Sequence, residues 1–310
     1  MTYTVVCGQA IDNTQSFKYI NQDRYLRYNF ENDYFAAADC YYTGGMNLEI
    51  IAPWISKIPL SRILVHGADS HVRYGIGLEN EMYTPTDIRK SDILYGNRPY
   101  AACLFLKTFV MSVDTVKKQR YTSVLSTGII GPAAGAMDIQ SFVHKVLPHN
   151  TVPKGWANQV HNDIILNYEV TYEKQFISIG RLFSLDAGGM LRAGTLSDKA
   201  AIGVTAMGCY FDSPFSTDIT AGSNFRVYAY AHPQVDIVGY DATMEGGLFD
   251  HTSPYTISPR NIRRFVFQNR YGIVLTFHKV YVEYFQVFIS SEFSTGGTHK
   301  WGGIQVAVAL

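Results

Sequence analysis

Two short polar segments of this 310-residue chain carry residue types that could bind a cation or activate water. Asn32 and Asp33 end one stretch of alternating residues, and Asp39 and Thr43 stand at the start of the next. If the two stretches pair as strands, these side chains gather at one rim of a sheet. Their oxygen atoms suit a hard cation such as calcium, although Asn, Asp and Thr are also ordinary turn residues.

A second candidate lies in 136–147, where apolar and polar residues recur at three- and four-residue steps. Asp138 near the start and Pro148 after the end predict a short helix there. Gln140 and His144 would share one face of this helix, one turn apart. A histidine can act as a general base at neutral pH, yet the chain has nine histidines. On this segment alone, a packed or surface histidine is the simpler interpretation.

The rest of the chain must position these residues, and its pattern is that of strands. In Arg24–Asp33 the apolar parity is Leu26, Tyr28 and Phe30, and the other parity is polar. Such alternation predicts strands with one apolar face. Aromatic residues near the strand ends and small or charged residues opposite them are typical of a closed antiparallel transmembrane β-barrel with a polar interior. A soluble sandwich or soluble barrel is the alternative.

The alternation predicts about twelve strands in one barrel domain over 24–310, with 1–23 as an N-terminal extension and the helix at the outer mouth. The expected strands are 24–33, 39–52, 70–82, 99–113, 119–130, 162–174, 176–190, 196–211, 225–246, 262–278, 279–291 and 300–310. Residues 1–10 resemble the tail of a secretory signal peptide, and a plain N-terminal tail is the alternative.

Composition excludes several classes of protein. With 26 basic and 26 acidic residues, the chain lacks the basic excess of a nucleic-acid binder. No run of eighteen apolar residues occurs, so a transmembrane helix is excluded, whereas a membrane barrel is not. The four cysteines have no CxxC spacing, which disfavours a zinc site. No GxSxG motif is present to anchor a nucleophilic serine.

An ordered series of short motifs is more specific than any one of them. The series is ENDYF (31–35), DCYYTGG (39–45), YTPTD (83–87), NRPYA (97–101), GIIGPAAG (128–135), QSFVH (140–144) and PKGWANQ (153–159). It resembles the lipid A 3′-O-deacylase family of outer-membrane enzymes, in order and spacing, from about residue 24 to the end. The resemblance implies a twelve-stranded, multi-pass barrel in the bacterial outer membrane. It also implies calcium-dependent hydrolysis that removes the 3′-linked acyloxyacyl chain of lipid A.

The same resemblance assigns roles to five residues. Asn32 and Asp33 match an essential Asn-Asp pair, Thr43 an essential hydroxyl, His144 the catalytic histidine, and Gln140 a glutamine one turn before it. His144 would deprotonate a water that attacks the ester carbonyl. A Ca²⁺ ion held by Asp33 and Thr43 would stabilise the oxyanion. Asn32 would orient either the histidine or the water.

The chain departs from the family pattern after the histidine. The family has an acidic residue a few positions on, whereas 145–150 contains no carboxylate, which leaves the metal ligand set incomplete. Arg98, Lys145 and Lys154 are expected to pair with phosphates of the lipid A or lipopolysaccharide substrate, with solvated loop cations as the alternative. We expect a monomer surrounded by outer-membrane lipid.

Two other functions compete with deacylation. The first is an outer-membrane phospholipase with Ser141 as nucleophile, although a nucleophile on the same helix as its base is an unusual geometry. The second is a non-catalytic barrel that serves as a pore or a structural protein.

Overall fold

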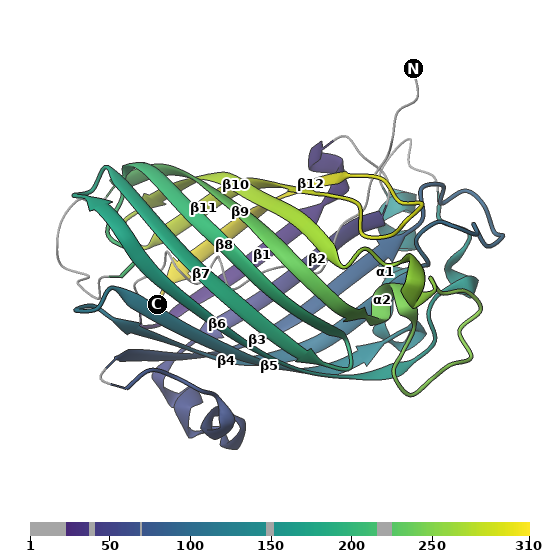
Figure 1. Cartoon of the computed structure of the whole chain (residues 1–310), viewed down its shortest axis with the longest axis horizontal. Helices are drawn as coiled ribbons and strands as arrows, with labels where there is room; N and C mark the ends of the chain where they lie inside the picture. The colour runs from purple at the N-terminus through teal and green to yellow at the C-terminus, as the bar shows by residue number, and fades with distance from the viewer. Residues whose placement is uncertain (1–22, 37–40, 69, 147–151, 216–224) are drawn as a thin grey trace.

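Twelve strands close into a barrel in the computed structural model (Figure 1). The structure describes residues 23–36, 41–68, 70–146, 152–215 and 225–310, with only the backbone of 142–146. The strands are β1 Tyr25–Asn32, β2 Tyr41–Ile51, β3 His71–Thr84, β4 Ala101–Asp114, β5 Gln119–Ile130, β6 Asp163–Ile179, β7 Phe183–Gly194, β8 Ser197–Tyr210, β9 Phe225–Asp241, β10 Phe265–Phe277, β11 Val280–Ile289 and β12 His299–Ala309. Because β1 pairs with both β2 and β12, the described sheet has no free edge.

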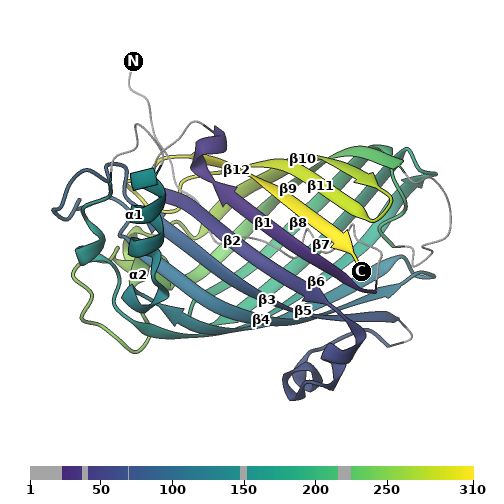
Figure 2. The same ribbon diagram turned by 180° about the vertical axis from the view of Figure 1, so that it is seen from behind.

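Helical elements occupy the connections. The α-helices are α1 Ala136–Val146 and α2 Ala242–Glu245, and the 3-10 helices are η2 Asp33–Ala36, η3 Pro53–Lys57, η4 Pro59–Ile63, η5 Pro132–Ala134, η6 Trp156–Asn158 and η7 Pro259–Asn261. Figures 1 and 2 both place α1 and α2 at one end of the barrel, which we call the mouth. No helix within the described ranges is long and apolar enough to cross a membrane.

The structure confirms the predicted fold class, the closed antiparallel barrel and the helix that begins at Ala136. Two predicted strands differ from the structure. The predicted strand 176–190 starts too early, because β6 continues to Ile179 and β7 begins only at Phe183. The predicted strand 225–246 is too long. It ends at Asp241, whose side chain accepts a hydrogen bond from the backbone N–H of Thr243 and so caps α2. The predicted extension over 1–23 lies outside the described residues except for Asp23, and so does all of 1–10.

The predicted parity of β1 is also present. Leu26, Tyr28 and Phe30 are 37–43% exposed on the outer wall, whereas Arg27 and Glu31 point inward and are almost completely buried. Apolar side chains that face outward are stable when the barrel is surrounded by lipid rather than water.

The prediction of a polar interior describes only the middle of the barrel. Apolar layers fill both ends of the lumen, with Tyr42, Tyr83 and Trp301 in the layer near the mouth. The layer at the opposite end includes Phe109 and Phe215. The alternating pattern predicts which side chains point inward, but not how far along the barrel axis each one lies. That height depends on how neighbouring strands pair, so the apolar layers could not be predicted from the pattern.

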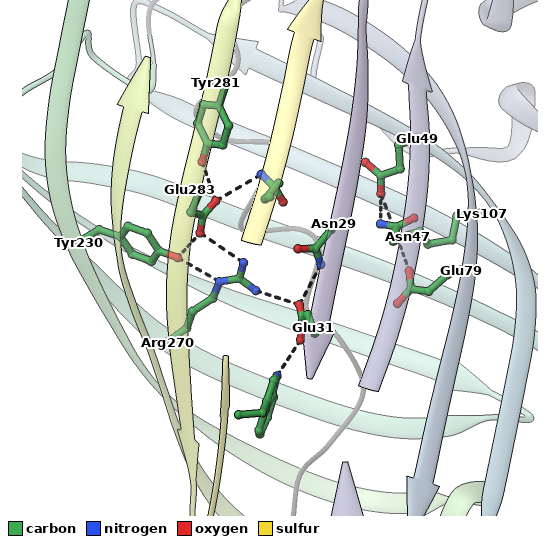
Figure 3. Close-up of polar contacts among 12 residues, drawn as sticks. Asn29, Glu31, Asn47, Glu49, Glu79, Lys107, Tyr230, Arg270, Tyr281 and Glu283 are labelled. Atoms are coloured by element: carbon green, nitrogen blue, oxygen red, sulfur yellow. Dashed lines mark hydrogen bonds and ion pairs between the residues drawn. The ribbon is translucent and has the colours of Figure 1, made fainter. Parts of the chain in front are cut away.

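Buried ion pairs line the inner wall of the barrel between the two apolar layers, and each joins strands that are near neighbours in the sheet (Figure 3). Arg270 on β10 lies 3.6 Å from Glu31 on β1 and 3.3 Å from Glu283 on β11. Lys107 lies 3.0 Å from Glu49 and also pairs with Glu79. Pairing offsets the cost of burying these charges.

Candidate active site on the outer wall

The strand register places the predicted site residues on the lipid-facing side of the barrel wall. Asn32 has the same parity as the exposed Leu26, Tyr28 and Phe30, and it pairs with Gly44 on β2. Gly44 in turn pairs with Met82 on β3, whose parity is that of the exposed Leu78. A β-bulge between Tyr42 and Gly44 leaves Thr43 unpaired in the ladder. Thr43 and Asn32 therefore lie near the mouth, outside the lumen.

The Asn32 side chain is bonded to the backbone on both sides of the turn. Its Nδ2 donates to the carbonyl oxygen of Thr43 at 2.6 Å, and its Oδ1 accepts from the N–H of Tyr34 at 2.8 Å. A Cβ atom at Gly44 would lie 2.9 Å from the carbonyl oxygen of Glu31 and 3.1 Å from Asn32 Nδ2. Glycine at position 44 thus lets the Asn32 amide cross to β2.

Asp33 begins η2 directly after this amide and is 4% exposed. The η2 turn folds over the outer wall, where the Phe35 ring packs edge-on against Phe30 and Tyr284. Gly302 on β12 permits this approach, because a Cβ there would lie 2.8 Å from the Phe35 Cβ. The fold therefore buries Asp33 in the turn that directly follows Asn32.

Thr84, which the sequence analysis did not single out, joins the site through Thr43. The two hydroxyl oxygens are 2.7 Å apart, and both residues are buried. The YTPTD motif contains Thr84, but its contact with Thr43 depends on the pairing of β2 with β3. Because a hydroxyl is both donor and acceptor, Thr43 retains a lone pair for another partner.

The segment around α1 packs against the same outer wall. Ala134 and Ala136 lie in one apolar cluster with Met82, Tyr100 and Trp156. Within this cluster the Tyr100 and Trp156 rings are 4.9 Å apart. Residues of the NRPYA and PKGWANQ motifs therefore pack together next to the start of α1 and support it.

This support holds the Gln140 carboxamide. Trp156 Nε1 donates to Gln140 Oε1 at 2.7 Å, and Gln140 is only 3% exposed. Gln140 Nε2 is buried and makes no hydrogen bond among the described residues. The amide therefore has an oriented donor available for an additional acceptor. His144 follows one helical turn later in α1, and its side chain lies outside the described part of the structure.

The site offers oxygen atoms as metal ligands but few carboxylates. Among the side chains that the structure describes, no group of three or more His, Cys, Asp or Glu residues could hold a metal ion. Asp33 directly follows Asn32, whereas Glu31 on its other side points into the lumen, and Asp39 lies outside the described residues. One buried carboxylate with amide, hydroxyl and carbonyl oxygens matches the ligand type of Ca²⁺ rather than of Zn²⁺.

The three cations predicted to contact substrate have different environments. Lys154 is exposed at the mouth, and the Lys145 side chain lies outside the described part. Arg98 is 1% exposed and donates to Glu292 Oε2 at 2.7 Å and to Thr243 Oγ1 at 2.6 Å, with its guanidinium over the Tyr83 ring. Arg98 thus joins three mouth connections inside the barrel, and its contact with substrate stays a prediction.

The Arg98–Glu292 pair predicts a pH dependence of stability. Burial raises the pKa of Glu292 from its usual 4.5 to about 8, although Arg98 opposes the shift. The unfolded chain therefore loses this proton at a lower pH than the folded chain, and stability falls as pH rises from about 4.5 to about 8. Glu292→Gln keeps an acceptor for Arg98 and has no proton to lose. In this variant the free energy of unfolding should no longer show the decrease, on the order of a few kcal/mol, that Glu292 causes between these pH values. Urea unfolding in lipid vesicles at several pH values measures it.

Asp250→Asn is the matched control, because Thr252 lowers the pKa of Asp250 and places its titration below this range. An unchanged slope in Glu292→Gln, or a flattened one in Asp250→Asn, would contradict the assignment.

Comparisons with known proteins agree with this architecture. The family model "Outer membrane protein LpxR" matches residues 1–310. No curated protein matches the chain. Among solved structures, LpxR from Salmonella typhimurium superposes with a TM-score of 0.74 at 18% identity, covering 92% of this chain and 100% of that one. The β domain of the Bordetella autotransporter BrkA reaches a TM-score of 0.47 at 8% identity, covering 94% and 100%.

The match to the family model spans the whole chain, and the superposition confirms the twelve-stranded barrel. The chain therefore belongs to the outer membrane protein LpxR family, and its barrel lies in the outer membrane.

Proposed function

We propose that this protein is a lipid A 3′-O-deacylase, which hydrolyses the ester of the 3′-linked acyloxyacyl chain. The observation that carries the proposal is that Asn32, Thr43 and the support of Gln140 lie on the outer wall near the mouth. A lipid substrate could reach this face while its acyl chains stay in the leaflet. A polar substrate would instead have to enter the lumen, where the apolar layer of Tyr42, Tyr83 and Trp301 lies near the mouth.

We assign the reaction steps to residues of this chain as follows. His144 accepts a proton from water, and the water attacks the ester carbonyl. The free Nε2 of Gln140 donates to the oxygen on which negative charge develops. Asn32, with both ends of its amide bonded to backbone, acts as a positioning residue for the turn that carries Asp33.

The oxygen donors also support a proposal for the metal. Asp33 and Thr43 would hold Ca²⁺, which when bound supplies positive charge for the developing oxyanion. Lys154, exposed at the mouth, and Lys145 would pair with lipid A phosphates. The monomeric state stays a prediction.

Mass spectrometry of lipid A and phospholipids from cells that express the protein tests the proposal. Deacylation removes the 3′ acyloxyacyl group and leaves the phospholipids intact. Accumulation of lysophospholipid would instead favour the phospholipase with Ser141 as nucleophile. Unchanged lipids, with the barrel folded in the outer membrane, would favour a non-catalytic protein.

The hydrogen bond from Trp156 to Gln140 can be tested separately. Trp156→Phe keeps an aromatic ring beside Tyr100 but removes the N–H that orients the Gln140 amide. Since one hydrogen bond contributes about 1 kcal/mol, we expect kcat to fall about fivefold. KM should change little, because the bond positions a donor to the transition state.

Trp301→Phe is the matched control. Its indole N–H donates to Glu31 Oε2 at 2.6 Å inside the lumen, away from α1. This variant should lose stability and keep its kcat. Equal kcat in parent and Trp156→Phe would remove Gln140 orientation from the mechanism.

A further inference from the structure

The connection between β2 and β3 forms a projection on the side of the barrel. It comprises residues 53–65, with η3 and η4, and we call it the side projection. In Figure 1 it is the coiled purple-blue segment below the barrel, beside the wall rather than beyond the mouth. It leaves β2 and returns to β3 at the end of these strands that is opposite the mouth.

The side projection is attached to the lipid-facing surface of the wall. Tyr168 Oη donates to the carbonyl oxygen of Ile63 at 2.9 Å and accepts from the N–H of Val65 at 3.0 Å. Ser123 Oγ donates to the carbonyl oxygen of Val65 at 2.8 Å. Leu64 is buried against Val110 and Leu125. Tyr168, Ser123 and Leu125 all have outward parity, since β5 and β6 direct the alternate residues into the lumen.

Several apolar side chains of the side projection are exposed in the part of the chain that the structure describes. Trp54 is 52% exposed and Ile63 56%, and Leu60 and Val65 are exposed as well. The strands to which the side projection is attached also carry an exposed apolar band, which includes Leu106 and Leu166. Because the barrel lies in a membrane, lipid rather than water borders that band.

The charges of the side projection are all of one sign. Lys57 and Arg62 are exposed, 53–65 contains no acidic residue, and neither cation has an ion-pair partner within the described part of the chain. Long connections such as 131–162 and 242–264 lie at the mouth, whereas the turns 115–118 and 278–279 lie at the other end. In outer-membrane barrels the longer loops face outward. The side projection therefore belongs to the inner leaflet.

We propose that the side projection is a membrane-interface anchor that binds anionic phospholipids of the inner leaflet. Trp54, Leu60 and Ile63 insert at the boundary between head groups and acyl chains, where tryptophan is favoured. Lys57 and Arg62 contact the phosphates. This inference uses the barrel's place in the outer membrane and does not depend on the proposed deacylation.

The three tryptophans allow a direct test, because Trp156 and Trp301 are 2% and 1% exposed and only Trp54 is open. The full chain is reconstituted in vesicles of phosphatidylcholine and phosphatidylglycerol. Tryptophan emission is compared between plain lipids and lipids brominated high on the acyl chain or near its end. We expect strong quenching by the shallow bromines, weaker quenching by the deep ones, and loss of most of the quenching in Trp54→Phe.

The charge contribution has its own measurement. Quenching by brominated phosphatidylglycerol should exceed quenching by brominated phosphatidylcholine at low salt. Lys57→Gln with Arg62→Gln should reduce this preference by up to about fivefold for each charge removed. Lys117→Gln, an exposed cation in the β4–β5 turn at the same end, should leave it unchanged.

Emission of Trp54 that brominated lipids do not quench, but that aqueous iodide quenches, would overturn the anchor. Equal quenching by the two brominated lipids would overturn the preference for anionic lipid. Neither readout measures hydrolysis, so failure here is distinguishable from failure of the deacylase proposal.

Discussion

Replacement of His144 by alanine should lower acyl-chain release by about two to four orders of magnitude, the usual contribution of a general base. His144 lies in α1, outside the strand ladder that closes the barrel. Removing its side chain therefore breaks none of the barrel's backbone hydrogen bonds. The variant should insert into the outer membrane as the parent does and release only traces of product.

Two controls separate catalysis from folding in this experiment. Parent and variant should show the same change in gel mobility on boiling, which reports a folded barrel. His161→Ala, at the same mouth, removes an exposed imidazole that contacts Thr252, and it should keep near-parental activity. Near-parental deacylation by His144→Ala would remove the residue from the mechanism. It would also undercut the other role assignments that depend on the family resemblance.

Chelation of divalent cations should reduce deacylation by about three orders of magnitude, since a metal can contribute several kcal/mol to oxyanion stabilisation. Added calcium should restore the activity. Asp33→Ala should be slow and should no longer respond to calcium, because the buried carboxylate supplies the charge of the proposed site. Asp33→Asn tests the charge alone, since it keeps the shape of the side chain.

Asp87→Asn is the matched control for calcium. Asp87 is a loop carboxylate that pairs with Arg89, and its loss should leave the calcium response unchanged. Full activity in excess chelator would reject the metal. Restoration by zinc and not by calcium would assign a different ion.

Most of the fold could be predicted from local pattern. Successive inward and outward side chains of β1 already determine which residues face lipid, and the same alternation in the other strands predicts twelve strands and a closed barrel. The helix at Ala136 follows from its spacing and from Pro148. The candidate residues Asn32, Asp33, Thr43 and Gln140 were found by motif order and by the family resemblance.

What the tertiary structure decided depends on contacts between distant segments. Spacing along the chain does not reveal that Thr84 meets Thr43, that Trp156 orients Gln140, or that the site lies outside the lumen, because these depend on strand register and on the packing of a long connection. The burial of Arg98 has the same origin, since its partner Glu292 is 194 residues away in sequence. Alternation specifies which face of a strand meets lipid, but not which loop covers that face. Residues 53–65 contain no alternating pattern, and only their bonds to Tyr168 and Ser123 place them beside the membrane-facing wall.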